Sequence, residues 1–116
     1  MSIPLDAIEF EYQKYAQAFG DASERFDAKA TNRNFRKLAA IRAKIKVSGK
    51  EGEGVLRRLM KDRSNAVAKC AAADSLHFAE VEALAVLDAI GKKTGAIALD
   101  AQIVAELWRS GKFRSR

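Results

Sequence analysis

The side chains best suited to catalysis are a single cysteine and a single histidine, Cys70 and His77. A cysteine becomes a nucleophile when a neighbouring base takes its proton, so their separation decides whether they form a pair. Seven residues apart on one helix, the two lie about two turns, or roughly 10 Å of rise, from each other. This spacing excludes direct contact. The alanines around Cys70 predict a buried small side chain, and His77, between Leu76 and Phe78, is expected to be a partly packed structural residue.

The acidic residues form no recognisable metal-binding or acid–base motif. Asp and Glu are scattered singly, without the spacing of zinc-binding helices or calcium loops. Nothing in the sequence predicts that Asp74 meets Asp88, or that Glu80 meets Glu82. The glycine-rich segment 49–54 superficially resembles a phosphate-binding loop, but it lacks the GK[ST] ending and a preceding strand. We therefore predict no catalytic residue, no cofactor and no metal, and that the protein is not an enzyme.

The remaining chemistry is electrostatic. The net charge is +6, and it is concentrated in residues 31–63, which hold eleven Lys or Arg against three Asp or Glu. Residues 1–30 have a net charge of −3 and residues 64–116 a net charge of +1. Such asymmetry predicts a positive surface in the middle of the chain.

Four of these basic residues fall on one side of a predicted helix, opposite its apolar residues. An acidic partner would bind such a side, although a helix face that is merely solvated has the same pattern. This basic face, the candidate partner-binding surface, consists of Arg33, Arg36, Lys37 and Lys44.

Helices are expected to position these side chains. One Pro and seven Gly among 116 residues favour long helices over a turn-rich β architecture, and the length fits one domain. The clearest pattern predicts a helix over residues 4–27. Its apolar residues alternate in spacings of three and four, and they are Leu5, Ile8, Tyr12, Tyr15, Phe19, Ala22 and Phe26. Gly20 lies off this stripe and should weaken the helix by about 1 kcal/mol.

A second helix is predicted to begin at a cap formed by Thr31 or Asn32 and to end near residue 47. Its inward residues are expected to be Phe35, Leu38, Ile41 and Ile45. Ser48 and Glu51 then form a capping-box pattern that predicts a break and a new helix. A further helix is expected to begin at a cap formed by Asp62 or Ser64.

The later helices are predicted from shorter apolar patterns, the last of them over residues 96–109 with Gly111 as its stop. Phe113 is expected to fold back onto the core, and residues 114–116 to be frayed. The predicted inward residues are Val55, Leu56, Leu59 and Met60, then Val67, Ala71, Ala72 and Leu76, then Val81, Leu84, Leu87 and Ile90, and finally Ile97, Ala101, Val104, Leu107 and Trp108.

The segment from Leu59 to Ala72 resembles a HEAT-type repeat. Such repeats place an Asp five residues before a Val and two small residues in the second helix, as Asp62, Val67 and the alanines at 71 and 72 do here. Ala68 stands where the family usually has Arg, which puts the ion pair within the repeat in question.

The whole chain resembles a small bacterial family of HEAT-like proteins catalogued as a domain of unknown function. The resemblance covers about residues 5–113. It rests on Asn32–Leu38, Leu59–Ala72, Leu87–Ile90 and Trp108–Phe113. It implies an all-α fold, a HEAT-like right-handed α–α superhelix, but no activity, cofactor or catalytic residue.

These observations predict a single HEAT-like domain over residues 1–116. It has about six helices in antiparallel hairpins, with a long hairpin over about 4–47 and shorter helices over about 50–109. The favoured function is a small non-catalytic scaffold or protein-interaction module that binds an acidic protein through the basic face. One alternative is nucleic-acid binding through the basic segment 33–63; the other is an immunity or antitoxin-type protein.

Two further expectations concern location and assembly. A lone cysteine, no signal-peptide pattern and no apolar run long enough to span a bilayer predict a cytoplasmic protein without membrane contact. The oligomeric state stays open, because the apolar stripe of the first helix fits packing within the chain or against a second copy.

Overall fold

The structure, a computed structural model, describes residues 4–112. Within this range the chain forms six α-helices and no strand, which confirms the predicted all-α class. The helices are α1 (Leu5–Glu24), α2 (Ala28–Val47), α3 (Gly49–Leu59), α4 (Asn65–Ser75), α5 (Glu80–Gly91) and α6 (Ala96–Arg109). None of the described helices is both long enough and apolar enough to cross a membrane.

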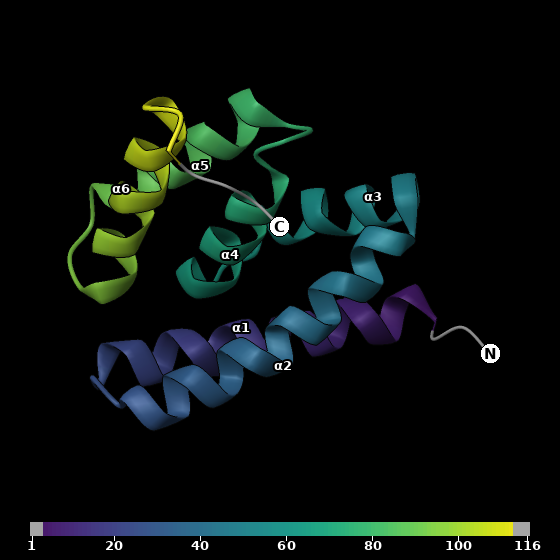
Figure 1. Cartoon of the computed structure of the whole chain (residues 1–116), viewed down its shortest axis with the longest axis horizontal. Helices are drawn as coiled ribbons and strands as arrows, with labels where there is room; N and C mark the ends of the chain where they lie inside the picture. The colour runs from purple at the N-terminus through teal and green to yellow at the C-terminus, as the bar shows by residue number, and fades with distance from the viewer. Residues whose placement is uncertain (1–3, 113–116) are drawn as a thin grey trace.

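The helices form two layers, as Figure 1 shows. The antiparallel pair α1 and α2 lies along one side, and α4, α5 and α6 lie across it, while α3 leads from the end of α2 into the second layer. The first helix contacts α2, α3, α4 and α6. In an open solenoid each unit contacts only its neighbours along the chain. These additional contacts instead give a compact globule with extents of 41 × 31 × 25 Å.

The centre of the core is α4, which contacts α1, α3, α5 and α6. Its side chains are buried on nearly every side, because alanine and cysteine let neighbouring helices approach closely. The predicted inward residues of this segment are all buried: Val67, Ala71, Ala72 and Leu76. The alanine-rich stretch is therefore the helix around which the others pack.

A glycine makes one of these close approaches possible. Gly20 of α1 lies so near α4 that a Cβ atom at this position would be 2.3 Å from the Cβ of Ala66. The sequence correctly places Gly20 off the large apolar stripe of α1. It does not reveal that the residue is buried in a helix–helix contact.

The turn between α1 and α2 corrects two predictions. The first helix ends at Glu24, three residues before the predicted end at residue 27, and the second begins at Ala28 with Asp27 as its cap. The Asp27 carboxylate accepts a hydrogen bond from the amide of Ala30 at 3.1 Å, so neither Thr31 nor Asn32 is the cap. Capping by Asp27 requires the chain to leave α1 earlier than the apolar period indicates.

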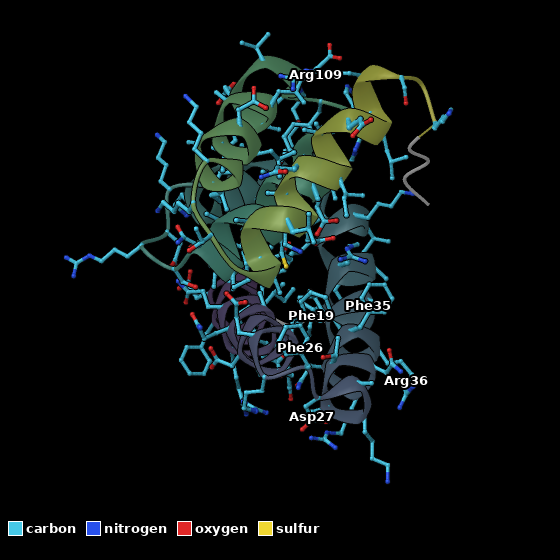
Figure 2. The ribbon with its side chains drawn as sticks, turned by 90° about the vertical axis from the view of Figure 1, so that its left-hand side faces the viewer. Phe19, Phe26, Asp27, Phe35, Arg36 and Arg109 are labelled. Carbon is cyan, nitrogen blue, oxygen red and sulfur yellow. The ribbon has the colours of Figure 1, made fainter. Side chains whose placement is uncertain are left out.

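Phe26 lies in this turn and is not part of the buried stripe. It adopts a left-handed backbone conformation with φ of 57°, and its side chain is 88% exposed. The amide of Asp27 donates to the carbonyl of Ala22 at 3.0 Å, a bond that closes the C-terminus of α1. Figure 2 shows Phe26 and Asp27 at this end of the hairpin.

The other two predicted caps have different outcomes. The capping box at Ser48 is wrong, because its hydroxyl donates to the carbonyl of Lys44 and no side-chain cap bond is made. The chain bends instead at Gly49, whose φ of 59° suits glycine. Ser64 is the cap of α4, accepting from the amide of Val67 at 3.3 Å, and Asp62 supports it by accepting from the amide of Ser64.

Besides Phe26, three apolar residues predicted to face inward are exposed. Phe35 is 48% exposed, Val81 83% and Leu107 36%. The reason is clearest in α6, which buries its alanines against the core, so that Leu107 lies on the exposed side with Leu99 and Ile103. Gly111, with φ of 76°, ends this helix as predicted. Phe113 and residues 114–116 lie outside the described part of the chain.

Candidate functional site

The basic face lies along one solvent-facing side of α2. Arg33, Arg36 and Lys37 are exposed, and Lys44 is half-buried. Their positions fall within an arc of roughly 100° around the helix axis and span roughly 16 Å along it. Figure 2 shows Arg36 pointing away from the rest of the molecule. The four side chains therefore share one accessible side of α2, and their role in binding stays a prediction.

The charge of this face is not neutralised by the surrounding structure. None of the four side chains forms an ion pair with another residue in the range 4–112. Lys37 Nζ lies 5.4 Å from the centroid of the Tyr15 ring. The whole of α2 contains seven Lys or Arg and no Asp or Glu. Apart from Arg42, the basic residues of α2 form no ion pair with another residue in the range 4–112.

The rest of the basic segment 33–63 behaves differently. Three of its arginines are engaged by acidic residues from other helices. The pairs are Arg42 with Asp74, Arg57 with Glu82, and Arg58 with Glu9. The eleven basic residues of the segment therefore do not form one continuous surface of unpaired charge. On α2, the unpaired side chains that share one side are those of the basic face.

The two candidate nucleophilic and basic residues do not form a catalytic pair. Cys70 is buried within α4, and burial raises the pKa of its thiol, although the nearby Lys69 ammonium acts in the opposite direction. His77 lies beyond the end of α4, exposed, with its ring 5.3 Å from that of Phe78. A buried thiol with a raised pKa is a poor nucleophile.

The acidic residues considered as pairs are engaged separately. Asp88 binds Arg109 of α6, whose Nη2 lies 2.6 Å from its Oδ2, and this hydrogen bond lowers the pKa of Asp88. Glu80 accepts from the indole of Trp108 at 2.6 Å. Across residues 4–112, no group of three or more His, Cys, Asp or Glu could hold a metal ion.

A partly buried polar cluster joins α1, α2 and α4. The hydroxyl of Tyr12 donates to Asp74 Oδ2 at 2.6 Å, and Arg42 Nε lies 2.7 Å from Asp74 Oδ1. Burial, and then the Asp74 charge, raises the pKa of Tyr12 well above its usual 10.0. Burial alone would lower the pKa of Arg42, but Asp74 raises it overall. Asp74 thus lies between the phenol of Tyr12 and the guanidinium of Arg42.

Beside this cluster lies a cleft of about 370 Å³ between α2, α3 and the end of α4. Its apolar walls include Ile45, Leu56 and Phe78, and its polar lining includes Arg42, Asp74, Lys46, His77 and Glu53. No motif in the sequence predicts this site. Its one available signal was Tyr12 on an inward stripe, since a buried phenol requires a hydrogen-bond partner.

A second buried charge, that of Lys69, was also not predicted from the sequence. Lys69 is only 6% exposed, and its Nζ lies 2.5 Å from Asp100 Oδ2 and 5.0 Å from the ring centroid of Phe19. Burial alone would lower the pKa of Lys69, but the neighbouring Cys70 and Asp100 raise it overall. This pair links α4 to α6. Ala68, the position at which the HEAT-type pattern usually has Arg, is buried.

Comparison with known proteins shows the fold and nothing more specific. No protein-family model matches the chain, and no curated protein matches it. The chain is similar in structure to the protein RPA1889 from Rhodopseudomonas palustris CGA009, with a TM-score of 0.86 and 24% sequence identity. The likeness covers 98% of this chain and 95% of that one. The resemblance to the HEAT-like family stays a prediction.

Proposed function

We propose that the protein is a small non-catalytic helical scaffold that binds an acidic protein through the basic face of α2. The observation that carries the proposal is the unpaired state of Arg33, Arg36, Lys37 and Lys44 on one accessible side of α2. A cluster of like charges repels itself. An acidic partner relieves this repulsion and releases bound counterions, so binding is expected to weaken as salt rises.

The proposal includes the finer description of the fold. We place α3 and α4 in a HEAT-like unit, supported by the turn in which Asp62 holds Ser64 and by the buried Val67 and alanines of α4. Helical-repeat folds use extended surfaces for partner binding. The single buried thiol fits a protein of the reducing cytoplasm.

Two alternatives remain as proposals of lower rank. Nucleic-acid binding would use the same unpaired side chains as phosphate contacts, but three other arginines of the basic segment already hold carboxylates. An immunity or antitoxin role is a special case of the favoured function, in which the acidic partner is an inhibited protein. Either alternative would involve the basic face.

The proposal is tested by capturing partners from native lysate at low and moderate salt with three proteins. These are the natural chain, a face variant, and a control variant with the same net charge. The face variant carries Arg33→Glu, Arg36→Glu, Lys37→Glu and Lys44→Glu. The control carries Lys50→Glu, Lys61→Glu, Arg63→Glu and Lys92→Glu, which are exposed and form no ion pair with another described residue.

The proposal predicts that an acidic protein is captured by the natural chain and by the control, and that the face variant loses it. Nuclease treatment distinguishes a protein partner from nucleic acid. Capture by all three proteins alike would eliminate the basic face as the binding surface. A captured species that disappears with nuclease would favour the nucleic-acid alternative.

A further inference from the structure

The cleft between α2, α3 and the end of α4 has the size of a ligand site. Its volume of about 370 Å³ lies within the range of small-molecule pockets, roughly 300–1,000 Å³. Exposed Lys46, Gly49 and His77 line it and leave it open to solvent. It lies away from the basic face, since Lys46 points about 160° away from Lys44 around the α2 axis.

The cationic part of the cleft retains unused hydrogen-bonding capacity. Both carboxylate oxygens of Asp74 are occupied, one by the phenol of Tyr12 and one by the ion pair with Arg42. The guanidinium of Arg42 pairs with Asp74 through Nε, which lies 2.7 Å from Oδ1. Its two terminal amino groups, in contrast, form no hydrogen bond or ion pair with another residue in the range 4–112. Arginine presents five N–H donors in a planar fork that matches a carboxylate.

The Arg42 fork is held in place by other side chains. The centre of the guanidinium lies 5.7 Å from the ring centroid of Phe35 on the next-but-one turn of α2. With Asp74 on one side and this ring nearby, the group is preorganised rather than free to rotate. Lys46, one turn further along α2, adds a second cation to the lining, which also includes Glu53 of α3.

Apolar side chains also line the cleft. Ile45, Leu56 and Phe78 offer two aliphatic side chains and an aromatic ring. Preorganised cationic donors beside an apolar wall complement a molecule with a carboxylate at one end and a hydrocarbon body. We propose that this cleft binds a small amphipathic organic carboxylate, with Arg42 and Lys46 holding the carboxylate and the body lying against Ile45, Leu56 and Phe78.

The test uses phenylacetate as the probe and phenethylamine, which has the same ring with the opposite charge, as its control. Each is titrated into the natural chain, and binding is followed by amide shifts in ¹H–¹⁵N spectra. Phenylacetate is expected to give saturable shifts at Ile45, Gly49, Leu56 and Phe78, and phenethylamine none. Absence of saturable shifts with phenylacetate, or equal binding of the amine, would overturn the proposal.

Two variants locate the carboxylate. Lys46→Glu reverses an exposed charge on the lining and is expected to weaken phenylacetate binding about tenfold. Lys61→Glu makes the same charge change at an exposed residue outside the lining and should leave the affinity unchanged. Arg42→Lys keeps the charge and removes the fork; if this variant fails to fold, the Lys46 result still decides. Equal weakening by Lys46→Glu and Lys61→Glu would mean that net charge, not the cleft, attracts the probe, and would contradict the proposal.

Discussion

Replacement of Gly20 by alanine separates what the sequence predicts from what the structure predicts. In an exposed helix interior, Gly→Ala stabilises a protein by about 1 kcal/mol, because alanine restricts the unfolded chain and favours helix. Gly20 is an interior residue of the 20-residue helix α1, so local propensity alone predicts that gain. The contact between α1 and α4 predicts the opposite sign.

The magnitude follows from the geometry of that contact. The new Cβ would lie 2.3 Å from the Cβ of Ala66 and 3.1 Å from Cδ1 of Ile97. Carbon atoms normally approach to about 3.5–4.0 Å, so the two helices would have to separate by about 1 Å. Neither Cβ can rotate away, since each is fixed to its backbone. Overpacking of this kind costs up to about 3 kcal/mol. After subtraction of the helix gain, we expect a net destabilisation of about 2 kcal/mol.

Urea denaturation followed by circular dichroism measures the change, and Gly54 provides a matched control. Gly54 lies within α3, where the nearest atom to an added Cβ is Arg58 Nη1 at 3.9 Å. Gly54→Ala should therefore stabilise the protein by about 0.5–1 kcal/mol. Adding Ala66→Gly to Gly20→Ala removes the clashing methyl group and should recover most of the loss. If Gly20→Ala were as stabilising as Gly54→Ala, the described contact between α1 and α4 would be refuted.

Three further predictions concern individual interactions. Tyr12→Phe should lower the free energy of unfolding by about 1.5–3 kcal/mol in urea denaturation, because Asp74 loses a hydrogen bond to its charged carboxylate. The raised pKa of Tyr12 stabilises the folded state below pH 10.0, its usual value, and this contribution is lost as pH rises further, so Tyr12→Phe should show a weaker loss of stability above that pH. Ser64→Ala should cost about 1 kcal/mol through loss of the α4 cap. Ser48→Ala should cost less, since Ser48 makes no cap bond, and equal losses would contradict the assigned caps.

The elements predicted from the sequence are those with a strong local signal. Ser64 caps α4, Gly111 ends α6, and the alanine-rich segment is buried, because each depends on nearby residues or on composition. The predicted end of α1 was wrong because the apolar pattern continues to Phe26. Capping of the next helix by Asp27 requires the chain to turn earlier. Local hydrogen bonding there overrides the burial of one aromatic ring.

The same distinction between local and long-range signals applies to the candidate functional residues. The basic face was predictable because its four residues lie on one helix, where spacing alone determines direction. The cleft was not, because its central hydrogen bond joins Tyr12 and Asp74, which are 62 residues apart. The pair of Lys69 with Asp100 likewise depends on how α6 packs on α4, and no local pattern indicates that.

The most direct test of the central claim is a map of where an acidic chain binds. Poly-glutamate is titrated into the ¹⁵N-labelled protein at low salt, and the amide shifts are compared along the sequence. We predict that the largest shifts occur at Arg33, Arg36, Lys37 and Lys44, and that they diminish as salt is added. Largest shifts at Lys50, Lys61, Arg63 and Lys92, or none at low salt, would contradict the assignment of the basic face as the partner-binding surface.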